Sequence, residues 1–236
     1  MKEQDLCKSH IIPKSFYPKS NNIKCITVYG DKPYTKRVQS GLYEYLLCEK
    51  AEKIFGIYEQ HAKKILISNI DKYSKLMQQI IIIPKDEYNY EYLKKFFISI
   101  IWRMSVSKIE HFENINLGKY ENIALKILKN EIPMNENFFV VMIRKNPEKS
   151  IYNSFFNAIM FKYNKKPACR LSFGGYNCDI ILEHDIKYFK SIPLLKTFTL
   201  LKDENLNIPI LEIIADKTKN EILERLTPHS ELFSNF

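Results

Sequence analysis

The stretch that decides the fold of the N-terminal region is Cys7-Lys8-Ser9-His10-Ile11-Ile12-Pro13. Residues 6–13 predict a short strand that ends in a turn at Pro13. After a glycine, residues 43–47 predict a second short strand. From Cys48 to about Ile67, apolar residues recur at the three- and four-residue spacing of a helix. We therefore expect a small element of two strands and a helix, and its residues suggest chemistry more than any other part of the chain.

Beyond this element the sequence predicts an α+β fold, with central helices and a C-terminal antiparallel β-rich part. A long, largely buried helix is expected from Asp86 to about His111, and a shorter one at Tyr120–Lys129. After Pro133 the pattern changes to β-branched and aromatic runs bounded by turn residues. These runs predict strands at Phe138–Arg144, Ser154–Tyr163, Cys169–Phe173, Cys178–Glu183, Pro193–Leu201 and Ile208–Ile214.

These patterns divide the chain into three parts. Residues 1–67 hold the ββα element, residues 68–132 form a helical segment, and residues 133–236 form an antiparallel β-rich α+β region, which ends with a short helix at Thr218–Leu226. The length suffices for one large domain or two small ones. The change near residue 133 therefore marks either a domain boundary or a division within a single fold.

The chain is basic, with a net charge of +9 and a sequence pI near 9.1. A basic protein favours anionic partners, because neutralising the phosphates of a nucleic acid releases counterions. Only five of the 36 basic residues are arginine, and the abundance of lysine, asparagine and isoleucine is equally typical of an AT-rich genome. The charge alone therefore leaves open both a nucleic-acid partner and a compositional bias.

Composition also excludes some classes of protein. A hydrophobic content of 45% with 13% aromatic residues is too high for a disordered chain. No apolar run approaches the roughly 20 residues that cross a membrane, so we expect no membrane partner. The five cysteines are widely spaced, and no secretory signal precedes them. This usage predicts reduced thiols and a cytoplasmic protein.

The N-terminal element resembles the HNH, or His-Me finger, endonucleases. The resemblance rests on Ser9-His10-Ile11-Ile12-Pro13, on the basic loop that follows, and on Leu46-Leu47-Cys48-x-x-Ala51-Glu52 at the start of the helix. It covers residues 6–67, about a quarter of the chain. The N-terminal element is similar to a divergent subgroup of this family, which places Glu where the usual pattern has Asn or His. The resemblance implies a ββα fold and a metal-dependent nuclease.

The same resemblance implies a catalytic role for His10 and divalent-metal binding, of Mg²⁺ or Mn²⁺, for Glu52 and Glu59. A neutral imidazole suits the task of taking a proton from water at pH 7, and carboxylates hold the hard cation that such a nuclease places on the phosphate. The two glutamates share a helix face within about 20° and lie roughly 10 Å apart along the axis. Alternatively, Glu52 and Glu59 lie on a solvated helix face and form ion pairs with neighbouring lysines such as Lys53.

Two departures from the family pattern favour a protein that keeps the fold without cleavage. Ser9 stands where the family usually places a metal-binding acidic residue or histidine. The second cysteine pair is broken, with Ala51 in the expected position, so we expect no structural zinc. Further along, Trp102-Arg103 is interpreted as packing, with Arg103 available to pair with a carboxylate.

The loop between the two predicted strands, residues 14–37, interleaves basic and aromatic residues. This composition suits contacts to phosphates and stacked bases. We therefore predict nucleic-acid contacts from four of its residues: Lys14, Lys19, Lys36 and Arg37. The alternative is a solvated loop that a few aromatic side chains hold in place.

Two functional hypotheses follow. The first is a metal-dependent nuclease that cuts DNA or RNA, by analogy in phage–host conflict. The second is a catalytically inactive, nuclease-like binding or regulatory protein, which would act through protein or nucleic-acid contacts of residues 138–214. A protein partner or a homo-oligomer is compatible with either hypothesis.

Overall fold

The computed structural model describes residues 5–17, 26–29, 32–35, 41–76, 79–147 and 155–210. Within these ranges the chain forms a mixed α+β fold with a β-rich C-terminal part, as the sequence predicts. The helices are α1 Glu49–Lys63, α2 Tyr90–Val106, α3 Tyr120–Leu128, α4 Ile186–Ser191 and α5 Pro193–Phe198. The strands are β1 Leu6–His10, β2 Ile26–Tyr29, β3 Lys32–Thr35, β4 Tyr43–Cys48, β5 Ser74–Leu76, β6 Ile80–Ile83, β7 Phe138–Lys145, β8 Phe155–Tyr163, β9 Lys166–Phe173, β10 Tyr176–Glu183 and β11 Leu206–Pro209.

The largest sheet has the strand order β3-β2-β8-β9-β10-β7. Strand β2 runs parallel to β8, and the remaining neighbours in this sheet are antiparallel. The turns from β8 to β9 and from β9 to β10 each contain two residues of positive φ, Asn164-Lys165 and Gly174-Gly175. Such turns match the twist of paired strands, and glycine and asparagine adopt positive φ at low cost. The Gly174-Gly175 pair thus forms the hairpin turn that closes β9 against β10.

Two smaller sheets flank the largest one. Strands β1 and β4 pair antiparallel, and the other small sheet has the order β11-β6-β5. Helix α1 begins at the residue after β4 ends, and it continues as a π-helical turn over Lys64–Ser68. The predicted strand–strand–helix element is therefore formed by β1, β4 and α1, with β2 and β3 of the largest sheet between β1 and β4 in the chain.

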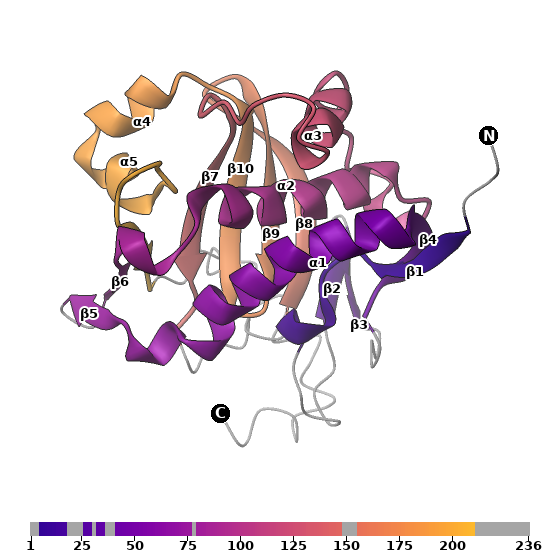
Figure 1. The fold of residues 1–236 in the computed structure, drawn as a ribbon, viewed down its shortest axis with the longest axis horizontal. Coiled ribbons are helices and arrows are strands. Elements are labelled where there is room, and N and C mark those ends of the chain that lie inside the picture. Colours follow the sequence, from indigo (N-terminus) through magenta and orange to yellow (C-terminus); the bar gives the residue numbers. More distant parts are fainter. Residues whose placement is uncertain are drawn as a thin grey trace.

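Helices α1 and α2 lie side by side across one face of the largest sheet (Figure 1). Between the layers, the ring of Phe16 lies 5.2 Å from that of Phe96 in α2 and 5.3 Å from that of Phe173 in β9, measured between centroids. One cluster of buried apolar side chains takes members from residues 1–67, 68–132 and 133–210. The three parts seen in the sequence thus pack around a common core.

The opposite face of the sheet is covered in part by α4. Because successive side chains of a strand point to opposite faces, Val140, Met142 and Ile181 face away from α2. They pack with Phe189 of α4 in a second, smaller apolar cluster. The Asp185 side chain caps α4 by accepting a hydrogen bond from Lys187 N at 3.0 Å.

Several expected elements differ from the observed ones. The strand predicted at Pro193–Leu201 is wrong, because residues 193–198 form the helix α5. Pro193 occupies the first turn of this helix, where its missing N–H costs nothing, and the Thr197 hydroxyl donates to the Pro193 carbonyl at 2.9 Å. Strand β3 lies where the sequence predicts only a loop. The predicted helix at Thr218–Leu226 lies outside the described residues.

The long helix α2 starts four residues later than predicted. Asn89 caps it, with its side-chain oxygen accepting a hydrogen bond from Tyr92 N at 3.0 Å. Most of the helix is buried, including Arg103, and none of the helices within the described ranges is long and apolar enough to span a bilayer.

Candidate functional site

The hairpin of β1 and β4 places His10 at the end of β1, directly opposite Tyr43. Lys8 pairs in the same way with Tyr45, and residues that face each other across two strands share one side of the hairpin. The Lys8 ammonium lies 3.6 Å from the centroid of the Tyr43 ring, and the His10 and Tyr43 rings are 6.1 Å apart. We call Lys8, His10, Tyr43 and Tyr45 the hairpin face.

The hairpin face is open to solvent and combines charge with aromatic surface. Tyr45 is 65% exposed and Tyr43 is 39% exposed. Contiguous exposed apolar surface, as opposed to a single exposed side chain, often marks a contact site. A lysine beside two tyrosines is suited to contact phosphates and stacked bases. The predicted catalytic residue therefore lies on a surface whose chemistry suits nucleic acid.

The other side of the hairpin is buried and contains Ser9. The Ser9 hydroxyl donates to the Cys7 carbonyl at 3.2 Å and accepts from Leu47 N at 3.3 Å. Leu47 is also buried. Ser9 thus contributes to the pairing of the two strands. Strand alternation places it on the side opposite His10.

Arg103 of α2 connects His10 to the helix α1. Its side chain is 1% exposed, and it donates hydrogen bonds to the His10 carbonyl, to the Ser99 carbonyl and hydroxyl, and to Glu59 Oε1 at 2.7 Å. The guanidinium carbon also lies 5.6 Å from the centroid of the Phe55 ring. One buried cation therefore fixes the backbone at His10 relative to Glu59, which confirms that Arg103 pairs with a carboxylate.

Glu52 lies two turns before Glu59, in the first turn of α1, where the helix dipole stabilises negative charge. Its Oε1 atom is buried and has no hydrogen-bond partner. A buried carboxylate oxygen without a partner is costly, and a bound cation or an ordered water would remove that cost. Lys53, the neighbour considered as its partner, pairs instead with Glu49 at 2.7 Å.

The carboxylates of Glu52 and Glu59 meet part of what a divalent cation needs. Magnesium is commonly held by one or two carboxylates together with waters and substrate phosphates, and Glu52 has an oxygen suited to that role. The Oε1 atom of Glu59 is already neutralised by Arg103. No group of three or more His, Cys, Asp or Glu side chains gathers as a metal site within the described ranges. The four cysteines in these ranges are free thiols.

Of the basic residues predicted to contact nucleic acid, the structure describes Lys14. It is exposed at the start of a 3-10 turn over Lys14–Phe16, which follows β1 closely. Lys19, Lys36 and Arg37 lie outside the described residues. Lys8 was not predicted, although its position two residues before His10 on a strand places it on the same side.

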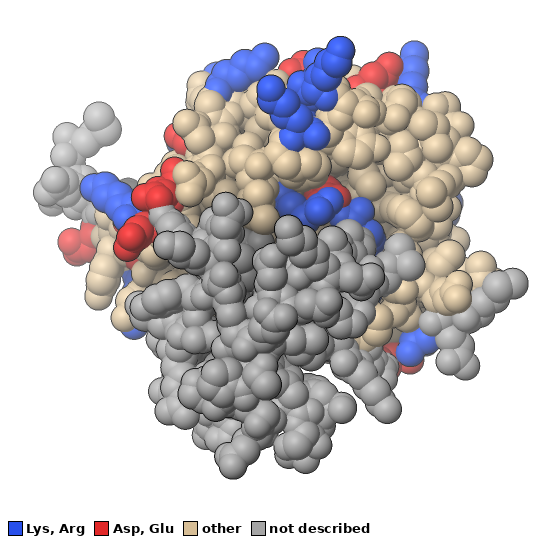
Figure 2. Space-filling view, turned by 180° about the vertical axis from the view of Figure 1, so that it is seen from behind, with Lys and Arg blue, Asp and Glu red and all other residues tan. Residues whose placement is uncertain are grey.

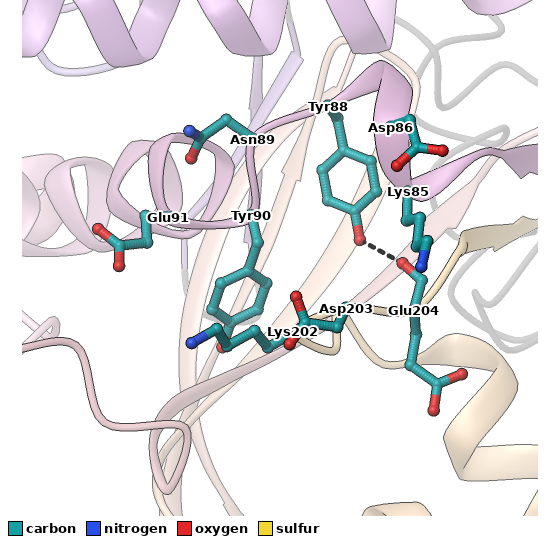
Figure 3. Close-up of a pocket in the computed structure, with 9 residues that line it drawn as sticks. All are labelled: Lys85, Asp86, Tyr88, Asn89, Tyr90, Glu91, Lys202, Asp203 and Glu204. Atoms are coloured by element: carbon teal, nitrogen blue, oxygen red, sulfur yellow. Dashed lines mark hydrogen bonds between the residues drawn. The ribbon is translucent and has the colours of Figure 1, made fainter.

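A separate cavity of about 370 Å³ lies where α2 begins (Figure 3). The rings of Tyr88 and Tyr90 point from the α2 side toward residues 202–204, and the Tyr88 hydroxyl donates to the Glu204 carbonyl at 2.9 Å. Acidic and basic side chains both line the cavity, namely Lys85, Asp86, Glu91, Lys202, Asp203 and Glu204. This mixture of charges points to no single class of ligand.

Lys94 contacts Tyr90, one of the residues that line this cavity, and its pKa is shifted. Burial lowers the pKa of the Lys94 ammonium to about 7, although the charge of Glu136 opposes this shift. The ammonium donates to the Tyr90 hydroxyl at 3.1 Å and to the Asn135 carbonyl at 3.2 Å. It therefore joins the start of α2 to the segment before β7.

The sequence names His10, Glu52 and Glu59 as candidates, and these stay predictions, whereas the exposed tyrosines of the hairpin face were not predicted. The signal that could have revealed Tyr43 and Tyr45 was strand alternation, which puts them on one side of their strand, as it does Lys8 and His10. Comparison of the chain with protein families, with curated proteins and with solved structures gave no match.

Proposed function

We propose that this protein is a metal-dependent nuclease of the HNH type. The proposal is carried by one observation: the antiparallel strands β1 and β4 lead into α1, with His10 at the end of β1 and the backbone of His10 tied to Glu59 through Arg103. Two strands and a helix with a histidine at the end of the first strand are what the sequence resemblance implies for such an enzyme. The substrate is DNA or RNA.

In this proposal the residues have distinct roles. His10 takes a proton from the attacking water. Glu52 would hold a divalent cation, and the cation would supply positive charge to the phosphate. Glu59 acts through Arg103 and positions the strand end at His10. Lys8 and Lys14 contact phosphates, and the basic net charge of +9 favours the approach of nucleic acid.

The experiment is a nicking and degradation assay on plasmid DNA and on RNA, with Mg²⁺, with Mn²⁺ or with EDTA. We expect cutting that needs the metal and that falls by at least about 100-fold in His10→Ala, the lower end of the range for loss of a general base. The control is His184→Ala, because this histidine lies against Tyr188 and Phe189 of α4, away from the hairpin. Absence of cutting under every condition, or equal cutting by His10→Ala, would refute the proposal.

A second function, binding without cleavage, is favoured by two observations. The hydroxyl of Ser9 is engaged within the hairpin, and the charge of Glu59 is neutralised by a buried guanidinium. In this case the hairpin face binds nucleic acid and no bond is broken. Fluorescence anisotropy with labelled oligonucleotides in EDTA tests it, because binding should weaken about tenfold in Tyr45→Ala, as stacking on an exposed aromatic ring is worth roughly 1–3 kcal/mol per base.

A further inference from the structure

The side of the largest sheet that faces away from α2 carries a cluster of polar side chains beside the apolar cluster of α4. Strand pairing sets Asp179 of β10 opposite Arg170 of β9, and Asn177 opposite both Arg144 of β7 and Ser172 of β9. Facing residues share one side of a sheet. We call Arg144, Asn146, Arg170, Ser172, Asn177 and Asp179 the polar cluster.

Hydrogen bonds join the members of the cluster into two groups. Arg170 donates to Asp179 through Nε at 2.6 Å and through Nη2 at 3.0 Å, and Arg144 donates to the same carboxylate. On the other side, Asn177 accepts from the Ser172 hydroxyl and donates to the Asn146 side-chain oxygen, each at 2.6 Å. A sheet face filled with polar groups is unusual in a protein interior, where apolar side chains normally pack.

The cluster contains more positive than negative charge. Two guanidiniums share the single carboxylate of Asp179. The Asp179 side chain is only 4% exposed, and the Arg144 side chain is 8% exposed. Burial by itself raises the pKa of Asp179, but hydrogen bonds from Arg170 and the charges of both arginines outweigh burial and lower it. The carboxyl is therefore ionised, and one positive charge remains without a counter-charge in the cluster. Arg144 and Arg170 are each paired with Asp179, and the excess charge reaches solvent through the partly exposed Arg170.

Arg144 also has an unused hydrogen-bond donor. The Nε atom of Arg144 is buried and has no hydrogen-bond partner. Solvent reaches the cluster from the side of Arg170, whose side chain is 40% exposed and lies over the ring of Phe161 at 5.1 Å. Figure 2, which looks onto this side of the molecule, shows basic and acidic side chains together in a recess near its centre. A small anion could enter there.

We propose that the polar cluster binds a phosphate group, with Arg144 and Arg170 supplying the charge and the guanidinium donors. Guanidinium groups recognise phosphate oxygens through paired N–H donors. A phosphate would neutralise the excess positive charge and give the Arg144 Nε atom an acceptor. Asp179 accepts hydrogen bonds from both arginines and so orients them. The site lies on the opposite side of the sheet from α2, so it is independent of the His10 hairpin.

The test is isothermal titration of the full chain, in EDTA and at constant ionic strength, with inorganic phosphate, thymidine 5′-monophosphate and thymidine. EDTA removes metal-dependent binding at the hairpin. We expect saturable binding of one phosphate group and no binding of thymidine. A monophosphate nucleotide that binds at least tenfold more tightly than inorganic phosphate identifies a nucleotide as the source, and equal affinities identify phosphate itself. The proposal would be overturned if thymidine bound as tightly as its monophosphate. It would also be overturned if inorganic phosphate showed no saturable binding.

Three variants locate the site. Arg144→Met and Arg170→Met should each weaken phosphate binding at least tenfold, whereas Lys187→Met, which removes an exposed positive charge from α4, should leave the affinity within twofold. Arg170 is partly exposed, so its replacement keeps the test valid if Arg144→Met fails to fold. Unchanged phosphate affinity in a folded Arg170→Met protein would overturn the assignment.

Discussion

The guanidinium of Arg103 lies 2.7 Å from the carboxylate of Glu59, and it also holds the backbone carbonyl of His10. The pair spans α1 and α2, and the third contact reaches the end of β1. This relationship makes the position of the candidate catalytic histidine depend on a buried charge 93 residues further along the chain.

We expect Arg103→Met to lower the free energy of unfolding by about 3–5 kcal/mol, the usual loss when one partner of a buried ion pair is removed. The substitution leaves the Glu59 carboxylate and the His10 carbonyl without their donor. Urea denaturation measures the change. Glu59→Gln, which keeps an acceptor for Arg103 but leaves its charge unbalanced, should also be destabilised. Wild-type stability in Arg103→Met would show that the network contributes little.

The unpartnered oxygen of Glu52 gives a prediction about metal binding. If Glu52 holds the cation, Glu52→Gln should raise the Mn²⁺ concentration required for half-maximal binding by at least about tenfold, the loss typical even of groups that support a metal ligand. Electron paramagnetic resonance of free Mn²⁺ measures this without any assay of activity. Glu49→Gln is the matched control, because Glu49 is in the same turn of α1 and pairs with Lys53 at the surface. Equal Mn²⁺ affinity in Glu52→Gln and wild type would remove Glu52 from the site.

Two glycines should respond in opposite directions to alanine. Gly41 has a φ of +76°, and an added Cβ would lie 2.9 Å from the Tyr17 ring and 3.3 Å from His10 Cδ2. Gly41→Ala should therefore cost about 1–3 kcal/mol of stability and displace the ring of His10. Gly56 lies in α1, and an added Cβ meets nothing within 4 Å, so Gly56→Ala should stabilise by roughly 0.5–1 kcal/mol.

Thermal unfolding of both glycine variants measures these changes, and the His10 ring resonances in an NMR spectrum report the displacement. If Gly41→Ala were as stable as wild type with unchanged His10 resonances, the close packing of Gly41 against Tyr17 and His10 would be wrong.

Lys94 gives a pH dependence of stability. Its pKa is about 7 in the folded protein and about 10.4 in an unfolded chain. Between these values the unfolded state binds more protons, so stability rises with pH. From pH 7 to pH 9 we expect the wild type to gain roughly 2 kcal/mol relative to Lys94→Met. Urea denaturation at several pH values checks this, and a constant difference between the two proteins would contradict the buried, partly neutral ammonium.

Much of the secondary structure could be predicted from short-range patterns. The hairpin strands, α1, the long helix α2 and the strands β7 to β10 follow from the spacing of apolar residues and from turn residues such as Gly174-Gly175. Residues 193–198 were mistaken for a strand because an apolar run of that length fits either structure. The position of Pro193 in the first turn favours the helix.

The sequence by itself determined the α+β class and the ββα order of the N-terminal element, because these depend on local periodicity. It supplied the candidate residues His10, Glu52 and Glu59 through the resemblance to HNH nucleases and the chemistry of those residue types. Only the tertiary structure decided which residues meet. It paired Arg103 with Glu59, gave Tyr43 and Tyr45 an exposed position beside His10, and gathered Arg144, Arg170 and Asp179 on one side of the sheet. Such contacts join residues that are distant in the chain, and they depend on strand register and helix packing, which local patterns do not specify.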